Sequence, residues 1–334
     1  MKTILTGVKP TGTLHLGNYF GAIKPAIQLG HQANAAGDRH MMFVANYHAL
    51  NYLKDASQLN QITKEVACAY LACGLDPNKS IFYRQSDVPE IFELTTILTN
   101  YTPKGLMNKS HAYKAVVDKN HAKGNPTDAG INMGLYNYPV LMAADILMFR
   151  TDEVPVGKDQ VQHVEIAQDI AGAMNAVYGQ EVLKIPSYIV QEFAQILPGT
   201  DGRKMSKSYG NVIPLFGTES EIKKAVMGIQ TDCQDINAPK NPEEILLFHM
   251  VQGIADEAIT AEVKEGLEKG GMGYGTIKKM LLAEIIRQVG GLRETYMDYM
   301  AHFSTVQDML NEGSKKARVI ARENLDRIKE VILG

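Results

Sequence analysis

Five short apolar runs in the first two thirds of the chain are typical of buried strands. They lie at residues 2–8, 41–45, 80–85, 152–157 and 187–190. Helical patterns separate them, with apolar side chains every three or four residues. Strands that alternate with helices and are apolar on both faces predict an α/β fold with a doubly wound parallel sheet. Ligands of such sheets bind at the carboxyl ends of the strands, so we expect functional side chains at that edge.

Three helices of this part have marked boundaries. The first is predicted over about residues 16–32. The second opens at Asp55, which together with Gln58 resembles a capping box. The third covers residues 160–178, and Gly179 follows it at the position where a left-handed residue commonly ends a helix.

After Pro214 the chain changes to helical periods with charged faces. The predicted helices cover residues 219–229, 242–254, 257–268, 275–301 and 303–332. We therefore expect a sheet domain over residues 1–203, a mobile loop and linker over 204–214, and an all-helical second domain over 215–334. The last helix is long enough to pack back on the first domain.

Composition narrows the class of protein. Of the 334 residues, 45% are hydrophobic, which is enough for one large core or two smaller ones. No apolar run approaches the roughly 18 residues that cross a bilayer, and Gly7 and Pro10 interrupt the start before a signal-peptide core forms. Three cysteines, an odd number without metal-type spacing, favour a reducing compartment, so we expect a soluble cytoplasmic protein. The net charge of -3 means that a polyanionic partner must be bound by local basic patches.

The stretch DGRKMSKSYGN, residues 201–211, gathers basic side chains on a loop with a glycine near each end. Arg203, Lys204 and Lys207 lie within five positions. On a plain surface such a run is most often a solvated face. The glycines permit movement and the loop follows the last predicted strand, so a second interpretation is a mobile pair of ammonium groups that binds a polyphosphate. Cations that reach a departing pyrophosphate as its charge develops would speed the transfer without overbinding the ground state.

A second anion site is predicted where the first strand meets the first helix, in the sequence TGTLHLGNYFG. The chain has no GxxxxGK[ST] phosphate loop, so a nucleotide must be bound in another way. Amides around Gly17 and Asn18 lie at the N-terminus of the helix, which favours anions. His15 and Asn18 share a face, and Gly17 permits close approach of an adenine ring. Simple capping of the helix by His15 and Asn18 explains the same residues equally well.

The sequence VPVGKDQVQH, residues 154–163, ends the fourth predicted strand. Gly157 permits close approach of a ligand. Asp159 lies where acidic residues of related sheets accept hydrogen bonds from a ribose diol. Taken alone, Asp159 is more simply explained as an ordinary N-cap.

Together these motifs carry a family resemblance. HLGN at residues 15–18 and KMSKS at 204–208 resemble the paired signatures of class I aminoacyl-tRNA synthetases, with the spacing of the compact subgroup for tyrosine and tryptophan. YPVLMAADIL at 138–147 is similar to the amino-acid pocket of bacterial tryptophanyl-tRNA synthetases, whereas tyrosine enzymes carry glutamine at the position of Met142. The likeness covers nearly the whole chain and includes TD at 231–232, YGTIK at 274–278 and GSKKA at 313–317.

The predicted amino-acid pocket suits a ring with one polar atom. An indole needs a flat apolar slot and one buried acceptor for its N–H, and Asp145 is the candidate acceptor. A carboxylate would also accept from a phenol hydroxyl, so the choice of tryptophan depends on Met142 and on the resemblance. The simpler alternative for residues 140–149 is a core helix with one satisfied aspartate.

The resemblance assigns further residues to the two sites. Those of the amino-acid site are Gly7, His48, Tyr138, Met142, Asp145 and Gln160. Those of the ATP site are Lys9, Pro10, Thr11, Gly17, Asn18, Gly157, Lys158, Asp159, Ile196, Lys204, Met205, Ser206, Lys207 and Ser208. The expected catalytic side chains are His15, Asn18, Lys204, Lys207 and Lys114, with Lys109 as the alternative to Lys114. No metal site of the protein's own is expected, because Mg²⁺ would be bound largely through ATP.

The chain also departs from the common bacterial pattern. Lys9 stands where many members have glutamine, and Lys158 stands where they have an acidic residue. Asn46 and Tyr47 replace an Asp-Gln pair, and the stretch 109–132 is longer than its commonest form. These differences concern the geometry of the triphosphate and indole sites rather than the reaction.

The resemblance further implies tRNA(Trp) as a partner. The helical half is then an anticodon-binding domain, with the regions 225–240 and 274–280 nearest the anticodon. Candidate phosphate contacts are Lys223, Lys224, Lys278, Lys315, Lys316 and Arg318. Any single one of these side chains is more often solvated helix surface.

A homodimer is implied as well. The helix-rich segment over about residues 87–120 resembles the dimer contact of the subgroup. Its apolar stripe consists of Ile91, Leu94, Ile97 and Leu98. Burial of this stripe inside the monomer explains the pattern equally well.

The implied activity is the formation of tryptophanyl-adenylate from ATP and L-tryptophan, followed by transfer of the acyl group to tRNA(Trp). A tyrosine-specific synthetase is the nearest alternative. A small-molecule nucleotidyltransferase would share the phosphate site but would not need the helical half. A non-catalytic RNA-binding regulator is disfavoured by the presence of Asn18, Asp145 and Lys204.

Overall fold

The centre of the molecule is a parallel five-stranded sheet with the strand order β3-β2-β1-β4-β5. This computed structural model describes residues 1–10, 12, 14–190 and 197–334. The strands are β1 (Thr3–Val8), β2 (Arg39–Val44), β3 (Ile81–Arg84), β4 (Glu153–Val156) and β5 (Ser187–Val190). The predicted doubly wound sheet is confirmed, and the boundaries of the five strands agree with the prediction to within two residues.

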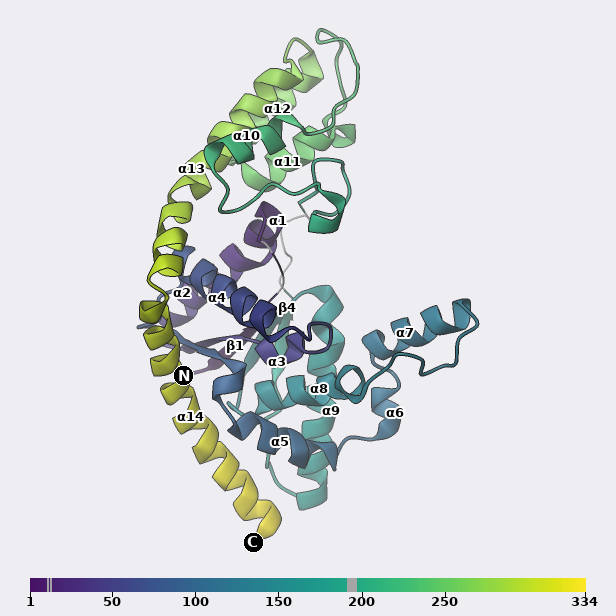
Figure 1. Ribbon diagram of the computed structural model, residues 1–334, viewed down its shortest axis with the longest axis vertical. Helices are drawn as coiled ribbons and strands as arrows, with labels where there is room; N and C mark the ends of the chain where they lie inside the picture. The colour runs from purple at the N-terminus through teal and green to yellow at the C-terminus, as the bar shows by residue number, and fades with distance from the viewer. Residues whose placement is uncertain (11, 13, 191–196) are drawn as a thin grey trace.

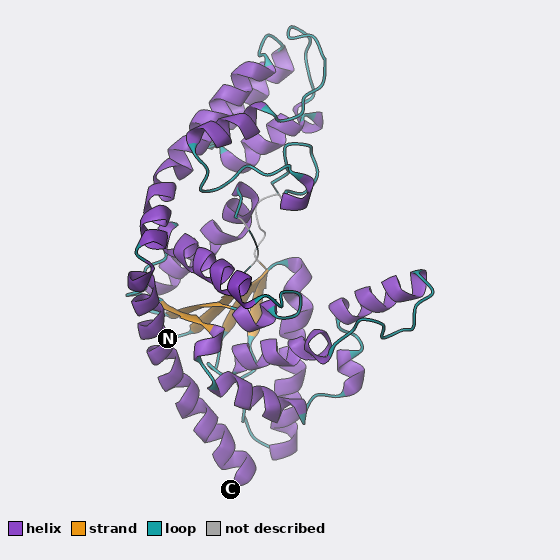
Figure 2. Ribbon diagram, viewed as in Figure 1, coloured by secondary structure: helices purple, strands orange, loops and turns teal. Residues whose placement is uncertain are grey.

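Helices cover both faces of the sheet and form the rest of the molecule (Figure 2). Those between the strands are α1 (Leu16–Asn18), α2 (Lys24–Ala35), α3 (Asn46–Ala49), α4 (Ala56–Ala72), α5 (Glu90–Thr99), α6 (Lys104–Met107), α7 (His111–Ala122), α8 (Met133–Leu147) and α9 (Val161–Tyr178). Those after the sheet are α10 (Glu219–Met227), α11 (Leu246–Ile254), α12 (Glu257–Lys269), α13 (Tyr274–Ala301) and α14 (Phe303–Leu333). Among the helices of the described residues, none has both the length and the apolar composition needed to cross a bilayer.

Alternate side chains of β2 enter two different cores, which explains why the central strands are continuous apolar runs in the sequence. Met42 and Val44 belong to one buried core, which continues into the helices after the sheet. Met41 and Phe43 point to a second core, which the helices α5, α8, α9 and α14 complete. Because both faces of the strand are covered at residues 41–44, each of these positions favours an apolar side chain.

The first predicted helix is wrong in one respect, since it is not continuous. A π-helical turn over Tyr19–Ile23 separates α1 from α2. Pro25, in the first turn of α2, has no N–H to donate to the carbonyl four residues before it. Instead the N–H of Lys24 donates to the carbonyl of Tyr19, which is five residues back.

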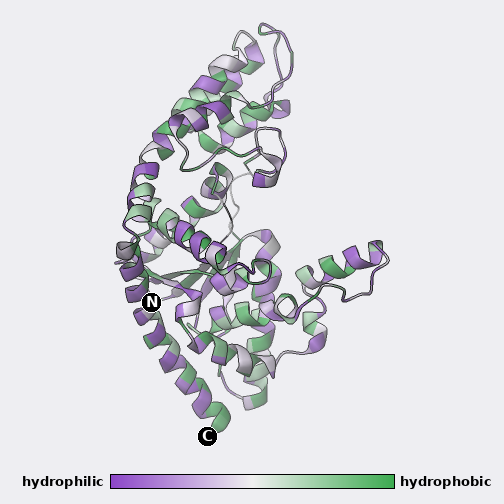
Figure 3. Ribbon diagram, in the orientation of Figure 1, coloured by the Kyte–Doolittle hydropathy of each residue, from purple (hydrophilic) through white to green (hydrophobic). Residues whose placement is uncertain are grey.

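The last two helices run along one side of an elongated, curved molecule (Figure 1). The helix α14 has alternating apolar and polar stretches (Figure 3), and its apolar side packs on β3. Gly313 is required at this crossing, since a Cβ there would lie 1.8 Å from the carbonyl oxygen of Phe82. The stretch GSKKA therefore has a packing role, with Ala317 fully buried.

The apolar stripe in α5 is buried inside the monomer. Ile91, Leu94 and Leu98 are fully buried, Ile97 is half-buried, and α5 packs against α8. This is the explanation that the sequence left open beside a dimer contact. The stripe is consequently no argument for a second copy of the chain.

Candidate active site

The two signature motifs lie directly against each other. His15 forms an antiparallel bridge with Pro214, just after the basic loop. The N–H of Leu16 donates to the carbonyl of Ile213, and the N–H of Leu215 donates to the carbonyl of Leu14. The start of α1 and the end of the loop thus form a short two-stranded pairing that fixes both at one edge of the sheet.

Side chains of the two motifs also touch. Met205 is buried, and its sulfur would lie 3.3 Å from a Cβ at Gly17. The same Cβ would lie 3.0 Å from Nδ1 of His15, so a larger residue at position 17 would have to displace one of these side chains. Burial lowers the pKa of His15, and the nearby positive charge of Lys204 lowers it further. His15 is therefore neutral at pH 7, with Nδ1 buried and without a hydrogen-bond partner among the described residues.

A buried asparagine organises the basic loop. Asn211 is only 2% exposed and accepts a hydrogen bond from the N–H of Ser206 at 2.8 Å. Its amide donates to the Asp201 carboxylate at 2.7 Å and to the carbonyl of Lys204 at 3.1 Å. The pKa of Asp201 is lowered to about 2, mainly by the hydrogen bond from Asn211 and then by that from Arg203. The backbone around Lys204 is thus held by side chains that make no use of its ammonium group.

Arg203 is not part of the predicted pair of cations. Its guanidinium donates twice to Asp201, at 2.6 and 2.8 Å, and lies 4.3 Å from the ring centroid of Tyr209. Lys204 is exposed beside it, and Lys207 begins a short 3-10 turn that ends at the left-handed Gly210. The hydroxyls of Ser206 and Ser208 are 2.8 Å apart.

The remaining predicted ATP residues lie around the same edge. Nζ of Lys9 is 4.3 Å from the ring centroid of Tyr52, whose hydroxyl donates to the carbonyl of Pro10 at 2.6 Å. Gly157 and the exposed Lys158 lead into α9 through a 3-10 turn over Lys158–Gln160. Thr11, Ile196 and the side chain of Asp159 lie outside the described part of the structure.

The predicted acceptor of the amino-acid site is a buried carboxylate that two side chains contact. Asp145, on α8, is fully buried. Nε2 of His48 lies 2.9 Å from Oδ2, and the amide of Gln85 donates to Oδ1 at 3.0 Å and to Oδ2 at 2.9 Å. Burial raises the pKa of Asp145, while these hydrogen bonds oppose the rise. A ring reaches this carboxylate only after neighbouring side chains move, and His48 is 11% exposed.

The other predicted amino-acid residues line the neighbouring elements. The Tyr138 hydroxyl lies 2.9 Å from Nε2 of His163, and its ring centroid is 6.2 Å from that of His48. Met142 is half-buried one turn along α8. Gly7 lies at the carboxyl end of β1, where a Cβ would meet the ring of Phe43 at 2.6 Å. The N–H of Gln160 donates to the carbonyl of Gly157 at 2.9 Å.

Lys114 lies apart from this group. It is exposed on α7, which projects from the body in Figure 1. Gln162 joins the base of this projection to α9, accepting from the N–H of His111 at 2.9 Å and donating to the carbonyl of Lys109 at 3.1 Å. The structure thus brings His15 and Lys204 together. The role of Lys114 as a phosphate ligand remains a proposal.

The protein's family follows from comparison with known proteins. A family described as "tRNA synthetases class I (W and Y)" matches residues 1–293. The chain belongs to this family. Its similarity to curated relatives extends over nearly the full length: it is 44% identical to a protein of Neisseria meningitidis named "Tryptophan--tRNA ligase", over 99% of this chain and 97% of the relative. A Pseudomonas putida protein of the same name is 45% identical, over 98% of this chain and 73% of the relative.

A solved member of the family has the same fold. It is the tryptophanyl-tRNA synthetase of Campylobacter jejuni, described as complexed with ADP and tryptophane. The two chains share 43% identity over 99% of each, with a TM-score of 0.85. The class I synthetase fold therefore extends over the whole chain, including the helices that follow residue 293.

Sequence reasoning missed Gln85, which contacts the predicted acceptor of this synthetase. The only signal was its position, since it follows β3 at the carboxyl edge of the sheet. It opens the 3-10 turn η2 (Gln85–Asp87). A polar residue after a buried strand is common, and nothing in one sequence indicates that its partner lies on α8.

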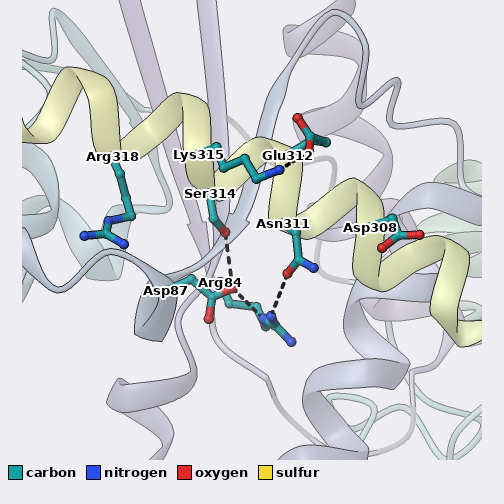
Figure 4. Close-up of a pocket in the computed structure, with 8 residues that line it drawn as sticks. All are labelled: Arg84, Asp87, Asp308, Asn311, Glu312, Ser314, Lys315 and Arg318. Atoms are coloured by element: carbon teal, nitrogen blue, oxygen red, sulfur yellow. Dashed lines mark hydrogen bonds and ion pairs between the residues drawn. The ribbon is translucent and has the colours of Figure 1, made fainter.

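The same turn forms one wall of a surface pocket of about 440 Å³ under α14 (Figure 4). Arg84 donates to Asp87 at 2.8 Å and to Gln307 at 2.9 Å. The hydroxyl of Ser314 donates to Asp87 at 3.2 Å. The pocket shares no residue with the predicted amino-acid and ATP sites, although the candidate tRNA contacts Lys315 and Arg318 line it. Its contacts anchor η2, which carries Gln85, to the last helix.

Several basic side chains proposed for tRNA have structural partners. Lys278 donates to the carbonyls of Met227 and Ile229, at 3.0 and 2.6 Å, and caps the end of α10. Arg318 forms an ion pair with the buried Glu90 at 3.0 Å. Lys315 pairs with its helical neighbour Glu312 at 2.6 Å. Lys278 and Arg318 are thus explained by the fold alone, while Lys223 and Lys224 are exposed on α10.

Proposed function

We propose that the chain is a tryptophan--tRNA ligase, which activates L-tryptophan with ATP and transfers it to tRNA(Trp). The observation that carries the proposal is the contact between the two signature motifs. In support of it, the half-buried imidazole of His15, with Nδ1 buried, lies near enough to Lys204 for that positive charge to lower its pKa, at the edge of the sheet where such folds bind nucleotides. The names and lengths of the relatives support the same substrate set.

In the first step of the proposed reaction a carboxylate oxygen of tryptophan attacks the α-phosphorus of ATP. The bond to the bridging oxygen breaks, and its electron pair leaves with pyrophosphate. In the second step a hydroxyl of the terminal ribose of the tRNA attacks the acyl carbon, and AMP leaves. Neither step uses a nucleophile of the protein, so alignment and charge stabilisation supply the catalysis.

The proposed roles follow from position. Neutral His15 and the amide of Asn18 donate to phosphate oxygens at the start of α1. Lys204 and Lys207 neutralise charge on the departing pyrophosphate. Mg²⁺ bound through the nucleotide supplies further positive charge at the phosphates. Among the described residues, no group of three His, Cys, Asp or Glu side chains is placed to hold a metal.

The other proposed assignments concern the amino acid and the domains. Asp145 accepts from the ring N–H, and Met142 with Tyr138 packs on the ring. Residues 1–203 are the catalytic domain, 204–214 the mobile loop, and 215–334 the domain that binds the anticodon. A homodimer is part of the proposal, and sedimentation equilibrium of the purified chain tests it.

Charging of tRNA tests the proposed function. The purified chain, ATP, Mg²⁺ and labelled tryptophan should give acid-precipitable label on tRNA(Trp) and none on tRNA(Tyr). Labelled tyrosine with tRNA(Tyr) is the matched control. Charging of tRNA(Tyr) with tyrosine would replace the proposal by the tyrosine-specific alternative, and no charging of either would support a non-catalytic RNA-binding protein.

A further inference from the structure

The amide of Gln85 joins three elements around the predicted ring acceptor. It is fully buried at the start of η2. Its Oε1 accepts from the N–H of Tyr47 at 3.1 Å, at the start of α3. Its Nε2 lies 3.0 Å from Oδ1 and 2.9 Å from Oδ2 of Asp145, on α8. His48, on α3, contacts the same carboxylate.

The orientation of this amide is determined by its neighbours. A backbone N–H only donates, so the amide atom that faces Tyr47 is the oxygen. An ionised carboxylate only accepts, so the atom that faces Asp145 is the nitrogen. A flipped Gln85 amide would place its nitrogen against the N–H of Tyr47 and its oxygen against the Asp145 carboxylate, so the amide keeps its orientation. It supplies N–H donors to Asp145 without adding a charge.

The lone pairs of the Asp145 carboxylate show how many further hydrogen bonds it can accept. The two oxygens of a carboxylate offer about four lone-pair positions. Among the described residues, Oδ2 of Asp145 receives both His48 and Gln85, while Oδ1 receives Gln85 alone. The second position on Oδ1 remains for a further donor.

We infer that Gln85 is a positioning residue for amino-acid recognition: it sets the rotation of the Asp145 carboxylate so that Oδ1 faces the ring N–H of the substrate. The inference rests on the proposed function. Gln85 acts through Asp145 and touches no reacting atom. Arg84, Asp87 and Ser314 hold the turn that carries it, so the last helix contributes to the geometry of the pocket.

The test is steady-state pyrophosphate exchange with the purified full-length chain. Gln85→Met keeps the length of the side chain and removes both donors. We expect the KM for tryptophan to rise at least about tenfold, because the carboxylate loses a buried donor and its orientation. The KM for ATP should change less than about twofold. Gln61→Met, which replaces an exposed amide on α4 that contacts Glu65, is the matched control and should leave the KM for tryptophan unchanged.

A second variant separates positioning from folding. In Gln85→Glu, the introduced carboxyl can donate to Asp145 when it is protonated, whereas its ionised form repels Asp145. The titratable groups around the carboxyl introduced at position 85 are His48, Asp145 and Tyr83. Burial and the charge of Asp145 raise the pKa of a carboxyl at position 85, so tryptophan KM in this variant should improve as the pH falls, relative to wild type.

An unchanged tryptophan KM in Gln85→Met would overturn the inference, and so would a pH profile of Gln85→Glu that parallels that of the wild type. Equal losses of tryptophan and ATP affinity in Gln85→Met would also overturn it. Wild-type protein that is silent with tryptophan would instead refute the proposed function.

Discussion

Among single residues, the two charged groups with proposed functions, the Asp145 carboxylate and the Lys204 ammonium, lie in opposite environments. Asp145 is fully buried and is kept in place by neutral donors. Lys204 is exposed, and the hydrogen bond that Asn211 donates to it reaches its backbone carbonyl. A buried acceptor discriminates between rings because an unmatched polar group in the pocket is costly. A solvated cation on a loop favours the transition state when charge develops within its reach.

Replacement of the loop lysines should separate these two functions. We expect Lys204→Ala or Lys207→Ala to slow adenylate formation by about 100-fold or more, as loss of one charge-stabilising donor commonly does. Binding of tryptophan should change less than about threefold. Single-turnover kinetics and equilibrium binding measure the two quantities, with Lys264→Ala on the exposed face of α12 as control. Equal losses of rate and of tryptophan affinity would contradict the assignment.

The sequence predicted residues whose chemistry is local and missed those whose role depends on a distant partner. The glycine at position 17 and the lysines of the loop follow from spacing and residue type. Gln85 and Asn211 are amides in ordinary turns, and their importance comes from contacts with residues 60 and 10 positions away. Such pairings arise from the packing of separate elements, which a single sequence does not encode visibly.

Among the contacts between elements, the crossing of α14 over β3 brings two backbones close together. Gly313 lies against the carbonyl of Phe82, and Ala317 is buried one turn later. Small residues at these positions let the helix approach the edge strand. The same helix holds η2 through Ser314, so this crossing also supports the proposed amino-acid pocket.

Gly313→Ala should therefore destabilise the protein, although alanine is the better helix former. A Cβ 1.8 Å from a backbone oxygen forces the helix away, at a cost of about 3 kcal/mol. Gly291→Ala on α13 is the matched control, because no atom lies within 4 Å of its Cβ position. That variant should gain up to about 1 kcal/mol. Thermal unfolding of both variants checks the difference, and a Gly313→Ala protein as stable as wild type would disprove the packing argument.

Helix existence was predictable from periodicity, and helix continuity was not. All five helices after Pro214 appear close to their predicted boundaries. The first helix is interrupted by a π turn, although its apolar positions recur regularly. Pro25 carried the signal, but a proline near a helix start is also compatible with a new N-terminus, so the pattern allowed both.

At the scale of the whole molecule, stability should depend on a buried histidine far from the substrate sites. His40, on β2, is fully buried, and its Nδ1 lies 2.9 Å from the hydroxyl of Ser80. Its Nε2 has no hydrogen-bond partner in the described structure. Burial lowers the pKa of His40 to about 4, and the charge of His31 adds to the effect. The folded protein thus keeps this imidazole neutral over a range where the unfolded chain binds a proton.

The sign of the resulting pH dependence follows directly. As the pH falls from about 6.5 to about 4, the unfolded state takes up a proton that the folded state does not, so folding stability is lost across that window. The loss due to His40 is up to about 3 kcal/mol. In His40→Gln this part of the pH dependence should vanish, while the exposed control His121→Gln should keep it. Denaturant unfolding at several pH values measures it, and identical slopes in all three proteins would contradict the account.

The division into a sheet half and a helical half was visible as a change of pattern near Pro214. The continuous core that joins the two halves was not, because it is built from residues as distant as Val66 and Leu281. The return of α14 to the sheet was suggested by length alone, and the contact at β3 depends on Gly313. Long-range packing of this kind is a property of the assembled fold.

The central claim is that this chain activates tryptophan, and amino-acid-dependent exchange of pyrophosphate into ATP tests it most directly. We expect rapid exchange with tryptophan and, at equal concentration, exchange with tyrosine that is at least about 100-fold slower. Exchange that is equal for the two amino acids, faster with tyrosine, or absent with both would contradict it.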